Sequence, residues 1–214
     1  MRYLISFILF GSLGWLPATA VADPEAEAQL DDLLSGLETL QADVTQLIVE
    51  SDGGVLEESD IRMMLKRPDG FYWETVAPFP ELVVTDGHSL WNYQPDLEQV
   101  VVEPWESSRS ELAAKLLSGD TAGLADEYTV ELRNTDGTEF TEFVLTPRAA
   151  DSVYQQITLT FRNRILEIIY IDSNNGQKTV WEFFDLVANA PLTDSQFVFQ
   201  IPPGVEVIQN TYVQ

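Results

Sequence analysis

The sequence predicts an α+β domain, in which an N-terminal helix accompanies a large antiparallel sheet. Three observations support this fold class. A leucine-rich amphipathic segment lies near the start, turn-forming dipeptides recur along the rest of the chain, and β-branched and aromatic runs separate those turns with no helices alternating among them. Strands joined by short turns form antiparallel meanders. Because no linker or composition break divides the chain, we expect one domain.

The first 22 residues have the pattern of a secretory signal peptide. Arg2 precedes an uncharged, mainly apolar segment that ends in small residues, as is typical of such signals. Cleavage fits after Ala20 or after Ala22, and we favour Ala22 because the residues that follow it suit the start of a helix. An uncleaved membrane anchor is disfavoured, since the apolar run is shorter than the roughly 20 residues of a spanning helix. The folded domain is expected to occupy residues 23–214.

The domain is expected to begin with an amphipathic helix. Asp23 can cap this helix, and Pro24 suits its first turn. Its apolar residues recur at spacings of three and four, which gives one stripe that must cover another apolar surface. The stripe consists of Ala26, Leu30, Leu33, Leu34, Leu37 and Leu40.

From Ala42 onward the pattern changes to strands. Asp-Gly and Asn-Gly pairs, which favour hairpin turns, separate many of the apolar runs. A second helix is expected near residues 108–117. The expected strands are residues 44–50, 55–67, 71–76, 81–85, 90–93, 98–103, 128–133, 139–146, 153–161, 165–172, 178–185 and a segment around 198–201.

Two of these strands carry apolar side chains on both faces. Residues 165–171 are apolar at both parities except at Glu167, and the aromatics at 71–73 alternate across the sheet. Such strands are either covered on both sides or line an apolar cavity. The pattern by itself favours ordinary core, because packed interiors are the rule.

Composition excludes several function classes. The chain has 11 Lys+Arg against 35 Asp+Glu, a net charge of −24, which argues against nucleic-acid binding. It has no cysteine and one histidine, His88, in a predicted turn, which excludes thiolate or multi-histidine metal sites. Neither a nucleotide-binding loop nor a nucleophile motif is present. We therefore expect no enzyme activity, no cofactor and no metal.

One segment, residues 66–73, stands out. The basic pair Lys66-Arg67 meets a proline turn that leads directly into the aromatics Phe71, Tyr72 and Trp73. A cation at a strand end, or a cation stacked on a ring, would be an ordinary explanation. Because basic residues are scarce in this chain, the pair is nevertheless unusual.

This segment resembles the periplasmic outer-membrane lipoprotein carrier family (LolA). The family pattern K-R-P-x-x-F-x-W matches residues 66–73, and S/T-D-G-x-x-L-W-x-Y-x-P-D-L-E-Q matches residues 85–99. Further matches occur at residues 44–46, 116–119 and 202–207, so the resemblance covers nearly the whole exported chain. The usual aromatic of the first strand is replaced by Val44.

The resemblance implies a curved, incompletely closed antiparallel β-barrel with helices as a lid over an apolar cavity. It also implies a periplasmic chaperone that binds the acyl chains of lipoproteins released by an inner-membrane ABC transporter and passes them to an outer-membrane receptor. We expect it to act as a monomer. The open alternative is a related periplasmic half-barrel that binds or senses lipid. The receptor itself is disfavoured, because its lipid anchor requires a cysteine.

The resemblance also suggests roles for individual residues. It assigns Arg67 as a latch that holds the lid through backbone carbonyls, and Phe71 as a residue of cargo uptake. Trp73 shares the strand parity of Phe71 and is expected to line the cavity. Weaker candidates for the cavity wall, for which ordinary core is an equal alternative, are Trp91, Leu33, Leu34 and Leu37.

Overall fold

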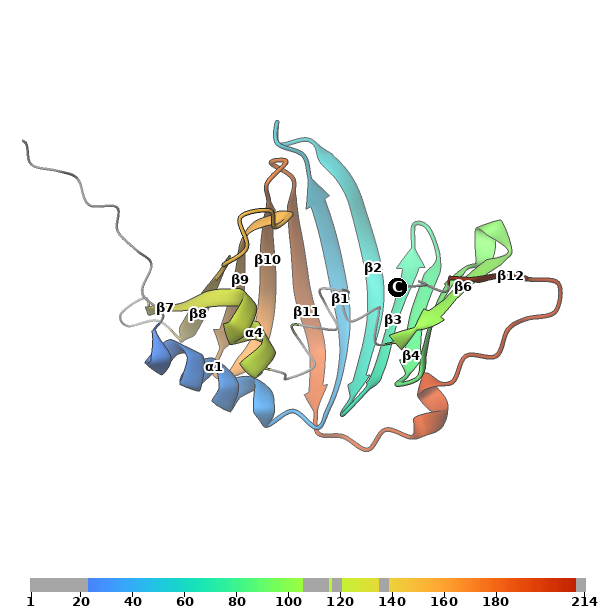
Figure 1. Cartoon of the computed structure of the whole chain (residues 1–214), viewed down its shortest axis with the longest axis horizontal. Coiled ribbons are helices and arrows are strands. Elements are labelled where there is room, and N and C mark those ends of the chain that lie inside the picture. The colour runs from blue at the N-terminus through green and yellow to red at the C-terminus, as the bar shows by residue number, and fades with distance from the viewer. Residues whose placement is uncertain (1–22, 106–115, 117–120, 135–138, 211–214) are drawn as a thin grey trace, which may run out of the picture.

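A computed structural model describes residues 23–105, 116, 121–134 and 139–210 (Figure 1). The expected signal peptide lies outside the described residues. So does the helix expected near residues 108–117, apart from Leu116. Two described α-helices, α1 (Pro24–Ser35) and α4 (Thr121–Glu127), accompany a large sheet.

The described strands form one 12-stranded sheet, with the order β12-β6-β5-β4-β3-β2-β1-β11-β10-β9-β8-β7. The strands are β1 (Thr39–Val49), β2 (Val55–Lys66), β3 (Gly70–Ala77), β4 (Glu81–Asp86), β5 (Ser89–Gln94), β6 (Gln99–Pro104), β7 (Tyr128–Asn134), β8 (Phe140–Pro147), β9 (Tyr154–Arg162), β10 (Ile165–Ser173), β11 (Lys178–Ala188) and β12 (Glu206–Gln209). This order confirms the antiparallel meanders expected from the turn signals.

The sheet consists of two meanders joined at the pair β1 and β11. In the register of this antiparallel pair Val44 lies opposite Phe183, while on the other side of β1 Leu40 lies opposite Leu65. The sheet is strongly curved (Figure 1) and stays unclosed, because its edges β12 and β7 are not neighbours in the order. This architecture confirms the expected incomplete barrel.

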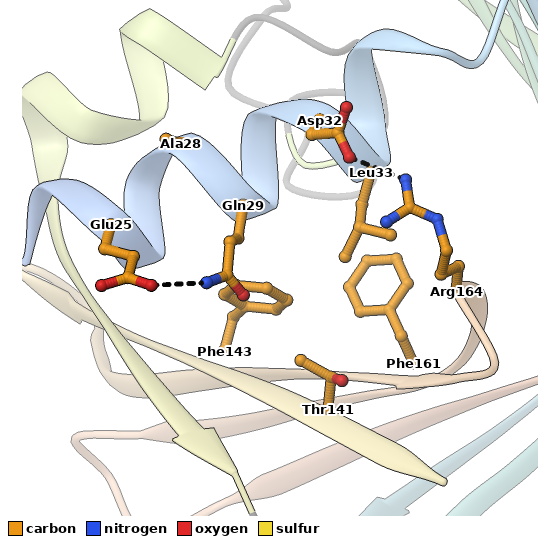
Figure 2. Close-up of a pocket in the computed structure, with 9 residues that line it drawn as sticks. All are labelled: Glu25, Ala28, Gln29, Asp32, Leu33, Thr141, Phe143, Phe161 and Arg164. Atoms are coloured by element: carbon orange, nitrogen blue, oxygen red, sulfur yellow. Dashed lines mark hydrogen bonds and ion pairs between the residues drawn. The ribbon is translucent and has the colours of Figure 1, made fainter.

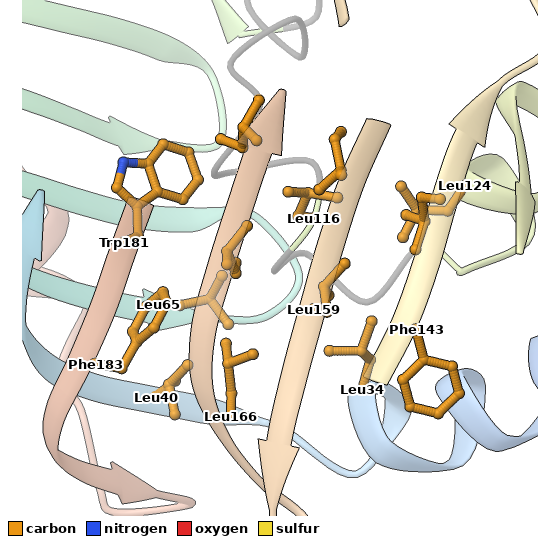
Figure 3. Close-up of a cluster of buried hydrophobic side chains, with 14 of the residues drawn as sticks. Leu34, Leu40, Leu65, Leu116, Leu124, Phe143, Leu159, Leu166, Trp181 and Phe183 are labelled. Atoms are coloured by element: carbon orange, nitrogen blue, oxygen red, sulfur yellow. The ribbon is translucent and has the colours of Figure 1, made fainter. Parts of the chain in front are cut away.

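The main core lies between the helices and one face of the sheet. Ala26, Leu30 and Leu34 are the buried residues of α1, and they pack with buried residues from strands of both meanders. Figure 3 shows part of this cluster, with Leu34, Leu159 and Phe143 close to one another and Trp181 and Phe183 on β11. Together α1 and α4, which contact each other, cover one end of the sheet (Figure 1).

The first helix is shorter than its apolar spacing predicts. It ends at Ser35, with Gly36 as its C-cap, so Leu37 lies in the following turn and Leu40 lies on β1. The spacing was misleading because Leu40 faces the same core from a strand as it would have faced from a helix. Its side chain is 1% exposed.

The strand expected around residues 198–201 is also wrong. Val198 and Ile201 are exposed and lie in an irregular segment between the short helix η2 (Asp194–Phe197) and β12. Pro202 and Pro203 follow, and neither has the N–H that a strand ladder needs. The chain instead forms β12, which pairs in parallel with the edge strand β6.

The segment from Asn189 to Val205, here named the strap, packs on the outer face of the sheet. Its Leu192 and Phe197 are buried against Val84, and Tyr72 and Trp91 pack against the same cluster. The alternating aromatics of β3 are therefore explained by cover on both faces, the main core on one side and the strap on the other.

Candidate functional site

The helix α1 is built as a cover with one apolar face. The Asp23 side chain accepts hydrogen bonds from the backbone N–H groups of Glu25 and Ala26 at 3.0 and 3.3 Å and so caps the N-terminus. The apolar stripe faces the core, whereas Asp31 and Asp32 are exposed. The last turn contains no basic residue to offset its unpaired carbonyl groups.

Arg67 supplies the missing cation from the sheet. It follows β2 directly, and its guanidinium donates to the carbonyl oxygens of Leu34 and, at 3.1 Å, of Ser35. Its backbone N–H donates to the carbonyl of Glu38 at 2.9 Å. A cation at the negative end of a helix dipole is favourable. Arg67 thus joins the end of β2 to the end of α1.

The Arg67 side chain is partly withdrawn from water. Burial lowers the pKa of Arg67, and the carboxylates of Glu38 and Asp31 act in the opposite direction. Its Nε atom is buried and, among the described residues, has no hydrogen-bond partner. Withdrawal from water therefore costs free energy at this position, and the hydrogen bonds of the guanidinium to α1 offset that cost.

Aromatic side chains extend from this contact into the core. Phe71 is 3% exposed and stacks on Trp73 with ring centroids 6.1 Å apart. Trp73 in turn meets the edge of Trp181 on β11 at 5.3 Å. The side chains of Phe71 and Trp73 thus face the main core, as their shared parity predicts.

The space beneath the Arg67 contact is nearly filled. A cavity of about 10 Å³ lies there, lined by Leu65, Phe71 and Trp105 together with the turn of residues 66–70. An acyl chain cannot enter a volume of this size at this position. Any apolar guest at this position requires α1 or the aromatic side chains to move.

The three leucine candidates of the N-terminal segment occupy different positions. Leu34 is completely buried, while Leu33 and Leu37 are partly buried and pack against the main core. Leu33 also lines an open groove between α1 and strands β8 and β9, with a volume of about 470 Å³. Figure 2 shows Leu33 above Phe161 in this groove, beside the Arg164–Asp32 ion pair.

Trp91 does not lie on the face of the sheet that packs against the main core. The register pairs Tyr72 with Val84 and Val84 with Trp91, so these three side chains share the outer face. Trp91 packs there against the cluster formed with the strap. The assignment of Trp91 as a cavity wall is therefore wrong, because its parity is opposite to that of Phe71 and Trp73.

Sequence reasoning missed three residues at this site. Trp181 completes the aromatic row, Trp105 donates through Nε1 to the Asp69 carboxylate at 3.2 Å, and Asn189 binds the turn after α1. For Trp181 a signal was present, since Trp181 and Phe183 lie on either side of Glu182 and therefore share one face of their strand. The other two contacts join residues far apart in sequence, which no local pattern reveals.

Within the described ranges, no three His, Asp or Glu side chains are grouped so that they could hold a metal ion. The same residues contain no helix long and apolar enough to cross a membrane.

The chain is similar in sequence to bacterial proteins named outer-membrane lipoprotein carrier protein. It is 38% identical over 210 residues to the outer-membrane lipoprotein carrier protein of Chromohalobacter salexigens, covering 98% of this chain and 99% of that relative. The protein of the same name from Pseudomonas aeruginosa strain PAO1 is 34% identical over 208 residues, covering 97% and 99%.

Among solved structures, a LolA superfamily protein from Nitrosomonas europaea aligns with a TM-score of 0.48 and 15% identity, over 84% of this chain and 99% of that one. Residues 35–200 match the family described as outer membrane lipoprotein carrier protein LolA, and this span includes β1 to β11 and Arg67. The chain belongs to the LolA family of outer membrane lipoprotein carrier proteins.

Proposed function

We propose that this protein is a periplasmic chaperone that holds the acyl chains of lipoproteins beneath α1 and releases them at the outer membrane. The observation that carries the proposal is the Arg67 contact. An apolar interior is covered by a helix whose C-terminal end is held by a few polar bonds from one side chain. Family membership and the carrier relatives support the same function.

The energies fit a reversible latch. Hydrogen bonds to a charged group contribute about 1.5–3 kcal/mol each, whereas burying an acyl chain gains about 0.8 kcal/mol per CH₂ group. A single long chain therefore outweighs the Arg67 bonds and can displace α1. Without cargo, the same bonds and the contacts of Leu34 favour the closed arrangement. Loading and closing thus compete for the same apolar surface.

Phe71 and Trp73 are the side chains that cargo meets in this proposal. They face the core next to Arg67, so an acyl chain that enters when α1 moves replaces helix contacts with aromatic ones. Carriage of this kind makes and breaks no covalent bond, so the proposal assigns no catalytic residue. The inner-membrane ABC transporter and the outer-membrane receptor are its proposed partners, and a cleaved signal peptide is the proposed route of export.

The test replaces Arg67 with Leu and isolates the protein from the periplasm for mass spectrometry of bound molecules. The matched control is Arg62→Leu, because Arg62 lies on β2, is exposed and pairs with Glu74 at 3.3 Å away from α1. We expect the Arg67 variant to retain several-fold more lipoprotein than the wild type or the control. Normal delivery without retained lipoprotein contradicts the latch. Bound free lipid in place of lipoprotein favours a lipid-binding or lipid-sensing relative.

A further inference from the structure

The turn that joins α1 to β1 is held from two sides. Arg67 binds it at both ends, through the carbonyls of Ser35, the last residue of α1, and of Glu38, which precedes β1. Asn189, the first residue of the strap, binds the same turn from the direction of β11. Arg67 and Asn189 are 122 positions apart in the chain. Both bind the short turn of residues 36–38 and the residues that flank it.

Asn189 makes two hydrogen bonds to this turn and one to the first residue of β1. Its Nδ2 donates to the carbonyl of Gly36 at 3.0 Å, its Oδ1 accepts from the N–H of Glu38 at 2.8 Å, and its own N–H donates to the carbonyl of Thr39 at 2.8 Å. The first of these bonds reaches the C-cap residue of α1. The amide side chain therefore serves one donor and one acceptor of the turn at the same time.

The backbone of Asn189 is adapted to this position. Its φ of 59° lies in the left-handed region, where asparagine is tolerated better than most residues. The Thr39 hydroxyl donates to the carbonyl of the next residue, Ala190, at 2.6 Å. The start of the strap is thus bonded to the start of β1, and from there the side chain of Asn189 reaches the carbonyl of Gly36.

We propose that Asn189 is a positioning residue that fixes the pivot of α1, so that the carbonyls of Leu34 and Ser35 meet the Arg67 guanidinium when the helix closes. The inference rests on the proposed role of α1 as a lid. On opening, the Arg67 bonds to α1 break, while the Asn189 bonds to Gly36 and Glu38 remain and define the point about which α1 turns.

The test uses the absence of cysteine from the natural chain. Ala26 on α1 is completely buried, so a single thiol introduced as Ala26→Cys reacts with a thiol reagent only when α1 leaves the core. In this background Asn189→Gly removes the two side-chain bonds and keeps the left-handed backbone accessible. We expect native-state labelling to become about 3- to 10-fold faster, because a helix end that is no longer positioned loses roughly the equivalent of one of its hydrogen bonds to Arg67, and those bonds exist only in the closed state.

The control variant is Asn175→Gly. Asn175 is also an exposed turn residue, and its Oδ1 accepts a backbone N–H, that of Gln177 at 2.9 Å, but it lies in the β10–β11 turn. Labelling should not change in this variant. Urea unfolding gives the global stability of each variant. If Asn189 had only a structural role, labelling would accelerate by no more than the loss of global stability accounts for.

Arg67→Leu in the same background makes the outcomes distinguishable. Faster labelling in both the Arg67 and the Asn189 variants, beyond what urea unfolding accounts for, supports the pivot. Faster labelling with Arg67→Leu but not with Asn189→Gly overturns the pivot and leaves the lid intact. If neither variant labels faster, α1 is not a lid held by Arg67, and the pivot falls with it.

Discussion

The Arg67 guanidinium donates a hydrogen bond to the carbonyl of Ser35 at 3.1 Å, which joins the end of β2 to the last turn of α1 across 32 positions of sequence. The same guanidinium also binds the carbonyl of Leu34, whose side chain is completely buried. A polar contact at the surface and an apolar contact in the core therefore hold the same turn of helix.

Replacing Arg67 with Lys should weaken this contact without abolishing it. A lysine ammonium is a point charge and lacks the planar fork with which arginine reaches two carbonyls at once. We expect backbone amide exchange in α1 to be faster than in the wild type and slower than in Arg67→Leu. Arg62→Lys, on the outer face, should leave this exchange unchanged. An Arg67→Lys variant that matches the wild type would show that charge alone holds α1.

Phe71 is expected to serve both packing and cargo uptake, and two substitutions separate these roles. Phe71→Ala should lower the free energy of unfolding by about 3–5 kcal/mol, because it leaves a cavity in the main core. Phe71→Leu removes fewer buried atoms and should therefore cost less than Phe71→Ala, but it should reduce the amount of lipoprotein recovered with the protein. Trp91→Leu, on the outer face, is the matched control and should leave recovery unchanged; a loss there equal to that of Phe71→Leu would contradict the assignment.

The ion pair of Asp32 and Arg164, 2.8 Å apart, should contribute weakly to holding α1. Both side chains are mostly exposed, at 70% and 68%, and exposed pairs contribute about 0.2–1 kcal/mol. A double-mutant cycle with Asp32→Asn and Arg164→Gln, read by urea unfolding, should give a coupling energy in this range at low salt. The coupling should shrink at 1 M salt, where charges are screened. A salt-independent coupling would contradict the electrostatic origin.

Tyr72 should make the protein less stable at alkaline pH. Burial, followed by the charge and hydrogen bond of Glu74, raises the pKa of Tyr72 to about 12, whereas the unfolded side chain ionises near pH 10. Its contribution is complete below about pH 10 and is lost as the pH rises toward 12, because only the unfolded state releases the proton there. Tyr72→Phe should flatten the decline of unfolding free energy over this window, and an unchanged decline would exclude Tyr72 as its source.

Turn dipeptides and side-chain alternation were sufficient to predict most strands of the sheet. Asp69-Gly70 and Asp86-Gly87 mark the turns at either end of the β3–β4 hairpin region, and the strands between them form as expected. Such signals work because turn chemistry and side-chain alternation act over a few residues. They failed where two different structures satisfy the same pattern, as at Leu40, and where consecutive prolines interrupt a β-like run after Ile201.

Some features of the candidate site could be predicted from local sequence patterns, and others could not. Strand parity correctly placed Phe71 and Trp73 on one face, but parity alone does not say which face is the interior, and the location of Trp91 depended on the register of β4 and β5. Arg67 was notable in the sequence as a scarce cation beside aromatics. Its partners, the carbonyls of Leu34 and Ser35, have no sequence signature, because every residue carries a carbonyl.

The residues alone predict an acidic α+β domain, its hairpins, the amphipathic character of α1 and the unusual segment around Arg67. These properties depend on side-chain type and short-range spacing, which the chain carries regardless of its fold. Three contacts become visible only in the folded chain: Arg67 binds the end of α1, Asn189 binds the turn that follows it, and the strap packs against Trp91. Each of these contacts joins segments far apart in the sequence. Pairing of β1 with β2 and with β11 brings Arg67 and Asn189 to the turn after α1, and the strap packs over Trp91 on the outer face. Such neighbours are set by packing of the whole chain rather than by short-range spacing.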